Sequence, residues 1–260
     1  MHPILFHVFG IPVFSYGFCL AVGFILAALS AIEMGKKQGI EKDAILDLAL
    51  WTLICAVVGA RVLYVGMEFS YFQKHPWEVF FLNKGGLIFY GGFAGGAVAA
   101  VAFMRRKGLP IWKTGDILLA VLPLGQMFGR VGCFMNGCCF GKPTLSAFKV
   151  TFPVGSLACE HYQELQPVHP VQLYESIGLG FLFLFLATLM DRKRFDGQVA
   201  ALYGLGYSAL RFCMEFFRGD NPPLALGFTL SQWISAGLFL TALCVYAGLN
   251  RNNKLGALIK

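Results

Sequence analysis

The sequence predicts an all-α polytopic membrane protein with about seven transmembrane helices. Of its 260 residues, 57% are hydrophobic and only 13% are charged, about half the charged share of an average soluble domain. Several apolar stretches reach the ~20 residues that a helix needs to cross a bilayer. We expect one transmembrane helical domain over residues 1–260, because no flexible linker, internal repeat or low-complexity tract divides the chain.

The apolar stretches place the spans in order along the chain. The third span is short and rich in glycine, and the fourth carries Asp116 and Pro123. The residues before the first span contain no Lys or Arg and no small-residue cleavage motif, so we expect the first span to act as an uncleaved insertion signal. The seven predicted spans are 13–33, 46–66, 87–104, 115–133, 172–190, 197–214 and 229–248.

The distribution of positive charge predicts the orientation. Thirteen of the 21 Lys and Arg lie in the connections at 36–42, 105–113 and 192–194 and in the tail after 250, against five in the other connections. The positive-inside rule makes the richer side cytoplasmic, with the N-terminus outside, the C-terminus inside and the long segment at about 134–171 facing outward. In a soluble protein the net charge of +7 would suggest a nucleic-acid partner, but here the positions of the charges matter more than their sum. We expect the lipid bilayer as a partner and no nucleic acid.

Three arginines fall inside the predicted spans. Arg61, Arg130 and Arg211 each lie 14 or 15 residues from the cytoplasmic end of a span, roughly 21–22 Å along a helix axis. Ionisable residues at membrane depth mark functional sites by default. The alternative interpretation is that these arginines extend to the outer interface or form structural ion pairs with Glu175 and Glu215.

Other polar residues converge on the same predicted level. Tyr207, Arg211 and Glu215 share one helix face at a spacing of four. Guanidinium groups bind phosphate in a bidentate geometry, so we infer a protein that handles an anionic phospholipid at the extracytoplasmic face. The further polar residues near this level are Tyr16, Tyr64, Tyr90, Gln172, Tyr174, Glu175 and Arg218.

Glycine pairs stand out at the start of the third span. Gly91 with Gly95 and Gly92 with Gly96 have the spacing of close helix packing. Bare backbone at Gly91 and Gly92 also allows a substrate to approach, and the two interpretations are compatible.

The outward-facing cysteines and His169 leave alternatives open. Cys133, Cys138, Cys139 and Cys159 lie toward the oxidising side, where disulfides form. Their spacing contains no C-x-x-C and lacks the Cys/His pairing of a zinc site, so we expect no metal. His169 is either a proton acceptor or part of the helix entry formed with the following proline.

The ordered motifs give the chain a family resemblance. It resembles the bacterial prolipoprotein diacylglyceryl transferases over nearly its whole length. The resemblance implies an inner-membrane enzyme that transfers the diacylglyceryl group of phosphatidylglycerol to the lipobox cysteine of a preprolipoprotein signal peptide. A thioether forms, glycerol phosphate leaves, and this is the first step of lipoprotein maturation. The motifs are SYG at 15–17, GARVLY at 59–64, YGGFAGG at 90–96, GRVGCFMNGCCFG at 129–141, HPVQLYE at 169–175 and GYSALRFCMEFFR at 206–218.

The resemblance also implies roles for individual residues. Arg130 matches the arginine that binds phosphatidylglycerol, and Arg211 matches an essential arginine of the sixth span. With these two, the predicted catalytic residues are Tyr16 and Tyr90. The predicted substrate-binding residues are Arg61, Tyr64, Gly91, Gly92, Arg130, Asn136, Gly141, His169, Gln172, Tyr174, Glu175, Tyr207, Glu215 and Arg218.

Two departures from the family pattern affect the chemistry. Many members have histidine where this chain has Tyr90, and many have Asn and Glu where Cys133 and Cys138 stand here. The group that accepts the proton of the incoming thiol is therefore left open between Tyr90, His169 and the phospholipid phosphate. No P-loop and no G-x-G-x-x-G is present, and we expect no cofactor.

Two other classes of protein were weighed against a lipid-handling enzyme. A transporter for an anionic solute would use similar arginines. Transporters, however, often contain internal repeats and broken helices near the midplane of the membrane. This chain shows no repeat, and its charges cluster away from the midplane, which disfavours transport. A membrane thiol oxidoreductase would explain the outward cysteines, but the missing C-x-x-C argues against it.

Overall fold

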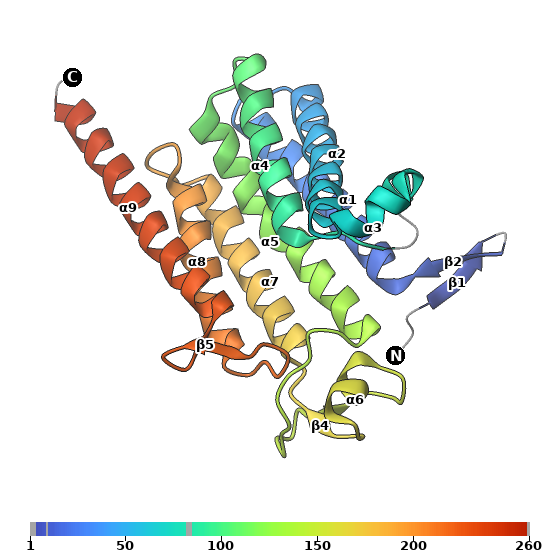
Figure 1. Cartoon of the computed structure of the whole chain (residues 1–260). Coiled ribbons are helices and arrows are strands. Elements are labelled where there is room, and N and C mark those ends of the chain that lie inside the picture. The colour runs from blue at the N-terminus through green and yellow to red at the C-terminus, as the bar shows by residue number, and fades with distance from the viewer. Residues whose placement is uncertain (1–3, 9, 82–84, 259–260) are drawn as a thin grey trace. The chain divides into compact units, whose positions relative to one another are not determined.

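The computed structural model describes residues 4–8, 10–81 and 85–258, and it is mostly helical (Figure 1). A long helix overlaps most of each of the seven predicted ranges. Among the described residues, five helices are long and apolar enough to cross a membrane, which confirms the class of helical membrane protein. These five are α1 (Ser15–Lys37), α2 (Lys42–Met67), α5 (Ile111–Asn136), α7 (Val171–Met190) and α9 (Leu230–Leu258).

The other two long helices are shorter and less apolar. Each of α4 (Phe89–Arg106) and α8 (Gln198–Glu215) has 18 residues. Glycines and a terminal arginine pair lower the apolar content of α4, and α8 carries Gln198, Arg211 and Glu215. The count of seven spans and the orientation of the termini stay predictions.

Short elements accompany the long helices. The first span was expected from residue 13, but residues 11–14 form a strand and the helix begins at Ser15. The segment 134–171, predicted to face outward, contains one short helix and two of the strands. Three antiparallel pairs form, namely β1 (Ile4–Val8) with β2 (Ile11–Phe14), β3 (Val150–Thr151) with β4 (Pro167–Val168), and β5 (Pro223–Ala225) with β6 (Phe228–Thr229). The short helices are α3 (Phe69–Lys74), η1 (Pro76–Phe80) and α6 (Leu157–Tyr162).

The chain folds into two compact units. The larger unit comprises Met1–Ala31 and Gly115–Lys260, and the smaller unit comprises Ile32–Thr114. The single transmembrane domain over 1–260 stays a prediction.

In the smaller unit, α2 and α4 pack side by side through glycines (Figure 1). A methyl group built on Gly91 would overlap the carbonyl oxygen of Gly59, and one on Gly95 would lie 2.5 Å from the carbonyl oxygen of Cys55. No side chain fits between the two backbones here, so the packing interpretation of the glycine pairs is confirmed. Substrate contact at Gly91 and Gly92 stays a prediction.

In the larger unit, a buried carboxylate explains how a predicted span accommodates Asp116. Asp116 is fully buried, and its oxygens accept hydrogen bonds from the Lys193 Nζ (2.8 Å) and from the backbone N–H groups of Gly197 (2.9 Å) and Ala200 (2.8 Å). The acid therefore caps the N-terminus of α8, where the helix dipole favours negative charge. Burial alone would lower the pKa of Lys193, but its hydrogen bonds to Asp116 and Asp196 outweigh burial and raise it.

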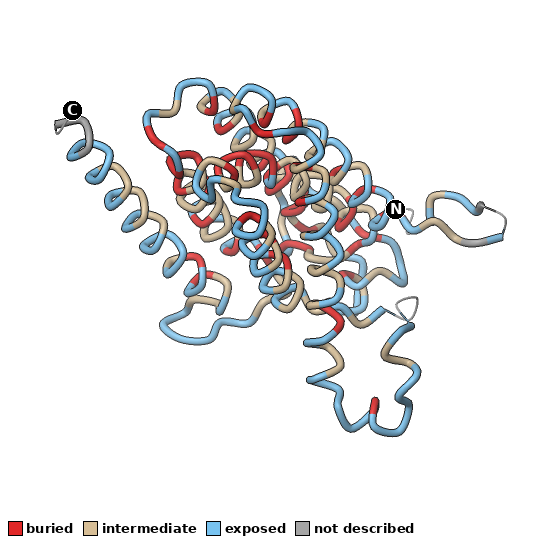
Figure 2. Tube along the Cα trace, turned by 90° about the horizontal axis from the view of Figure 1, so that it is seen from above, coloured by how far each residue is buried: buried red, intermediate tan, exposed pale blue. Residues whose placement is uncertain are grey.

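Helices α7, α8 and α9 run alongside one another in the larger unit (Figure 1). Most positions along α9, the helix that leads to the C label, are exposed or partly exposed (Figure 2). Exposed positions of α7 and α9 carry large apolar residues such as Phe181, Leu184 and Leu240. Such surfaces suit contact with lipid tails, because exposed apolar side chains cost nothing there. The buried polar residues of α7, namely Gln172, Glu175 and Ser176, instead lie in its first two turns.

Candidate functional site

The centre of the candidate site is an ion pair between α5 and α7. Arg130 Nη2 lies 2.8 Å from Glu175 Oε1. The Glu175 side chain is almost fully buried, whereas 19% of the Arg130 side chain is exposed. A guanidinium carries five N–H donors, and Glu175 is the one partner of Arg130 within the described ranges. Arg130 is thus held at one end and keeps donors for a further anion.

A second buried carboxylate holds Arg211 on α8. Arg211 Nη1 lies 2.6 Å from Glu215 Oε2, and its Nη2 donates to the Ser231 hydroxyl at 3.2 Å. Glu215 is 2% exposed and also accepts hydrogen bonds from Asn221 and Thr229. The predicted helix face of Arg211 and Glu215 is therefore a buried network that fixes the guanidinium in place.

Tyr207 lies within the electrostatic influence of these arginines. Its ring stacks on that of Tyr203 with centroids 5.6 Å apart. Its hydroxyl lies within electrostatic reach of Glu175, Arg130, Arg211 and Arg218. Arg130 and Arg218 also interact with each other electrostatically. The structure thus gathers three of the predicted cations around one tyrosine in the larger unit.

Gly141 lies where two segments meet. The residues on either side of it hydrogen-bond the segment that follows α8. Lys142 N–H donates to the Phe217 carbonyl at 2.8 Å, and the Phe140 carbonyl accepts from Gly219 N–H at 3.1 Å. A methyl group at Gly141 would overlap the backbone and Cβ of His169. Only glycine fits this position, which holds the residues after α8 against the residues before α7.

The remaining predicted residues of the larger unit surround the end of α5. The Gln172 Nε2 donates to the Cys138 carbonyl at 2.7 Å, and the Asn136 side chain hydrogen-bonds the Cys138 thiol. His169 Nδ1 lies 3.4 Å from the Tyr174 hydroxyl. Tyr16, at the start of α1, lies within electrostatic reach of Arg130.

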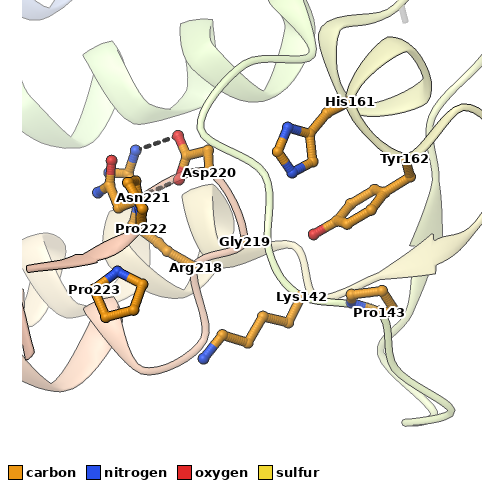
Figure 3. Close-up of a pocket in the computed structure, with 10 residues that line it drawn as sticks. All are labelled: Lys142, Pro143, His161, Tyr162, Arg218, Gly219, Asp220, Asn221, Pro222 and Pro223. Atoms are coloured by element: carbon orange, nitrogen blue, oxygen red, sulfur yellow. Dashed lines mark hydrogen bonds and ion pairs between the residues drawn. The ribbon is translucent and has the colours of Figure 1, made fainter. Parts of the chain in front are cut away.

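A cavity of about 520 Å³ lies next to this cluster (Figure 3). Arg218 forms one wall and binds Asp220 through two hydrogen bonds of 2.8 and 2.6 Å. Burial would lower the pKa of Arg218, but Asp220 outweighs it and raises that pKa. Burial and the charge of Asp220 raise the pKa of Tyr162, whose hydroxyl donates to the Gly141 carbonyl at 3.0 Å. The lining residues are Lys142, Pro143, His161, Tyr162, Arg218, Gly219, Asp220, Asn221, Pro222 and Pro223.

The sequence analysis missed most of this cavity. Of its lining residues, only Arg218 was predicted to bind substrate. Asp220, which anchors Arg218, follows it by two residues, and that proximity was the one available signal. Lys142 and Tyr162 come from the long segment 134–171, whose course the sequence pattern did not reveal.

Arg61, in the smaller unit, is bound by the chain itself. It is 8% exposed, and its five N–H donors bind backbone carbonyls of residues 78–86 at 2.6–3.1 Å. Its guanidinium also lies 5.5 Å from the Tyr64 ring centroid and 5.4 Å from that of Phe72. In this arrangement Arg61 stabilises the chain and has no donor left for a phosphate. The substrate-binding role of Arg61 and Tyr64 stays a prediction.

Tyr90 is the other predicted catalytic residue of the smaller unit. It lies in the first turn of α4, is 54% exposed and makes an edge-on contact with Phe89. Its catalytic role stays a prediction.

Comparison with known proteins decides the family. The family model for prolipoprotein diacylglyceryl transferase matches residues 3–247. The chain is 34% identical to the phosphatidylglycerol–prolipoprotein diacylglyceryl transferase of Finegoldia magna over 92% of each chain. It is 35% identical to that of Pediococcus pentosaceus over 94% of this chain and 88% of the other, and 30% identical to that of Clostridium tetani over 95% and 97%.

This chain belongs to the prolipoprotein diacylglyceryl transferase family. Membership confirms the resemblance inferred from the motifs and the prediction that the protein is a transferase. With its apolar helices, it also confirms a multi-pass membrane protein.

One feature of this diacylglyceryl transferase was not foreseen. The sulfur atoms of Cys133, Cys138 and Cys139 all lie within 4.8 Å of one another. Hydrogen bonds from the Cys133 and Cys138 thiols, followed by the charges of Arg218 and Arg130, lower the pKa of the Cys139 thiol. The spacing of these cysteines along the sequence had predicted no such cluster.

Proposed function

We propose that this chain transfers the diacylglyceryl group of phosphatidylglycerol to the lipobox cysteine thiol of a preprolipoprotein and releases glycerol phosphate, the first step of lipoprotein maturation. Family membership supports the reaction. The observation that carries the assignment of the site is Arg130, a largely buried guanidinium with one carboxylate partner, near Arg211 and Arg218.

The chemistry explains why arginines suit this site. A sulfur atom attacks the glyceryl carbon that bears the phosphate, a C–S bond forms, and the C–O bond to phosphate breaks. The electron pair of that bond stays on the departing phosphate oxygen, so negative charge grows there. Cations fixed in advance near that oxygen stabilise the transition state without reorganising during the reaction.

The carboxylates act as positioning residues in this proposal. Glu175 holds Arg130, and Glu215 with Ser231 holds Arg211. Each arginine is fixed through only some of its guanidinium nitrogens. We assign the remaining N–H donors to the phosphate oxygens of phosphatidylglycerol. A fixed fork binds phosphate with less loss of side-chain entropy than a mobile lysine does.

We place the active site at the extracytoplasmic face of the bacterial inner membrane, with seven spans and the C-terminus in the cytoplasm. The basic connection Arg192–Arg194 follows the end of α7, whereas Glu175 lies in the second turn of that helix. About 15 residues separate Glu175 from the end of α7, roughly 22 Å of helix. The basic connection and the arginine cluster therefore lie near opposite ends of the helix, as the positive-inside rule requires for an outward-facing site.

The lipid bilayer supplies both substrates in this arrangement. Phosphatidylglycerol and the apolar signal peptide each reach the site laterally, and the lipobox cysteine lies at the outer membrane surface.

Transfer assays with purified protein test the proposal. Labelled phosphatidylglycerol and a lipobox peptide are mixed with the wild type, Arg130→Ala or the control Arg251→Ala, which removes an exposed cation from α9. We expect labelled thioether product from the wild type and the control, and a loss of about 100-fold or more in Arg130→Ala. Absence of product from well-folded wild-type protein would contradict the proposed reaction.

A further inference from the structure

The strongest feature outside the arginine network is the cluster of Cys133, Cys138 and Cys139. All three are free thiols, Cys133 is buried, and the other two are partly buried. Cys133 lies in the last turn of α5, and the other two follow the end of that helix. Three thiols that meet within 4.8 Å of one another form a potential ligand set.

The backbone is shaped to bring these thiols together. Gly137 ends α5 in the left-handed region with φ 75°, and Cys138 N–H donates to the Cys133 carbonyl at 3.2 Å. Cys139 also has a left-handed φ of 59°, which is uncommon for a residue with a side chain. These two turns fold the chain back, so that Cys138 and Cys139 return to the helix end. Strain of this kind persists where the surroundings hold it and is typical of functional sites.

The dimensions match a zinc ion with one open position. A Zn–S bond of 2.3 Å implies sulfur–sulfur separations of about 3.8 Å in a tetrahedral site. The observed upper limit of 4.8 Å is within reach of small side-chain rotations. Structural zinc sites have four protein ligands, whereas catalytic sites have three protein ligands and a fourth position for water or substrate. Three soft thiolates also favour zinc over hard cations.

The surroundings fit a charged metal site. Gln172 is 1% exposed, its Nε2 donates to the Cys138 carbonyl, and its Oε1 is buried without a hydrogen-bond partner among the described residues. The Arg130 charge interacts with Cys133 and Cys139, and that of Arg218 with Cys139. Three thiolates and one Zn²⁺ carry a net charge of −1, which these cations compensate.

We propose that Cys133, Cys138 and Cys139 bind Zn²⁺ and that the thiol of the incoming prolipoprotein cysteine occupies the fourth position. This inference rests on the proposed function, and it reverses the expectation of no metal, which considered only spacing in the sequence. The fourth ligand of this zinc site is the thiol of the substrate. Zinc would activate that thiol in a chain that has Tyr90 where many family members have a histidine.

The step balances without a redox partner. A thiol that coordinates zinc loses its proton, which passes to water. The thiolate is the nucleophilic form of cysteine. Its sulfur lone pair forms the C–S bond to the glyceryl carbon while the C–O bond breaks, and the phosphate leaves with the electron pair near Arg130. The zinc ion keeps its charge throughout, because it has no redox chemistry.

Metal content tests the site directly. Wild type, Cys133→Ser, Cys139→Ser and the control Cys244→Ser are purified in detergent with zinc in the medium, and zinc is counted by mass spectrometry. Cys244 is an exposed free thiol on α9, so its variant controls for the loss of a cysteine. We expect about one zinc per chain in the wild type and the control, and a loss of roughly tenfold or more in the other two variants. Zinc retained in Cys133→Ser would mean an adventitious ion and overturn the proposal.

Cobalt provides a readout that does not depend on variants that fail to fold. Wild-type protein loaded with Co²⁺ is expected to show thiolate-to-metal absorption, and a lipobox peptide is expected to change its visible spectrum. The same peptide with serine in place of cysteine is the control and should leave the spectrum unchanged. No thiolate absorption, or equal effects of the two peptides, overturns the inference.

The outcomes separate this inference from the proposed function. Active wild-type protein that holds no zinc, resists a chelator such as 1,10-phenanthroline and tolerates Cys133→Ser overturns the metal site and leaves the reaction standing. A disulfide within the cluster in active, zinc-free protein does the same. Zinc-loaded protein that never forms thioether product overturns the reaction, and thiol activation with it. Loss of transfer on chelation, restored by zinc, supports both.

Discussion

Arg61 and Arg130 each lie six residues before the end of an apolar helix, yet the structure uses them in opposite ways. Arg61 in the smaller unit donates all five of its N–H groups to backbone carbonyls. Arg130 in the larger unit pairs with the Glu175 carboxylate through one edge, and 19% of its side chain is exposed. The sequence presents the two as equivalent, at similar distances from a cytoplasmic helix end.

The comparison teaches how to recognise a functional buried cation. A guanidinium whose donors are all satisfied by the chain is a structural crosslink, because no donor is left for a ligand. A guanidinium held by one carboxylate is fixed in place and still able to bind an anion. Burial and charge alone do not distinguish the two, and the count of satisfied donors does.

The sharpest test separates activity from stability at Arg130. Arg130→Ala should abolish transfer and also destabilise the protein by about 3–5 kcal/mol, because Glu175 is left as an uncompensated buried charge. Arg130→Ala combined with Glu175→Gln should recover most of the thermal stability in detergent and none of the transfer activity. If the double variant regains activity, Arg130 serves only to neutralise Glu175, and the contrast with Arg61 fails.

A smaller effect is expected for Arg211→Lys. Lysine keeps the charge next to Glu215 but loses the fork that also reaches Ser231. We expect transfer to fall by roughly 10- to 100-fold, as the loss of one or two charged hydrogen bonds implies, with little change in the melting temperature. Initial rates at saturating and limiting phosphatidylglycerol would show whether kcat or KM changes. Wild-type rates would remove Arg211 from the phosphate site.

Arg61→Lys should show the reverse pattern. An ammonium has three donors in place of five, so at least two backbone carbonyls lose their partner. The free energy of unfolding should fall by about 1–3 kcal/mol, whereas the transfer rate per folded molecule at moderate temperature should stay near the wild-type rate. Thermal unfolding and activity measured on one preparation give both quantities. A large loss of rate without a loss of stability would support the substrate-binding role predicted for Arg61.

The smallest effects are expected at Gly91 on α4, which packs against Gly59 on α2, the helix that carries Arg61. Gly91→Ala should destabilise the protein by about 1–3 kcal/mol, because the added methyl group meets the Gly59 carbonyl. Gly66→Ala is the matched control, since nothing lies within 4 Å of a methyl group there, and it should stabilise α2 by roughly 0.5–1 kcal/mol. Equal melting temperatures for the two variants would argue that α2 and α4 separate readily.

Much of the site was predictable because its residues lie on regular helices. Tyr207, Arg211 and Glu215 recur every four residues, so one helix face carries them whatever surrounds it. Arg130, Glu175 and Tyr207 were singled out because charged and polar groups in apolar runs are costly and need partners. The pairing of Arg130 with Glu175 was an alternative in the sequence analysis, and the structure confirms the contact.

Other parts depend on irregular backbone that no periodicity describes. The cavity walls of Lys142, Tyr162 and Asp220 come from segments outside the long helices, and they meet because Gly141 pairs with Arg218. The thiol cluster depends on two left-handed residues, Gly137 and Cys139. A residue with a side chain adopts that conformation only when its surroundings hold it, so the sequence did not indicate it.

The sequence by itself determined the class of protein, its long helices and its family, because the hydrophobic length of a span and a set of ordered motifs are local properties. Only the tertiary structure decided which buried arginine is satisfied and which keeps free donors, and that three separated cysteines meet. The physical reason is that the partners of a buried polar group are chosen by chain segments far away in sequence, where each backbone carbonyl, carboxylate and thiol either reaches the group or does not.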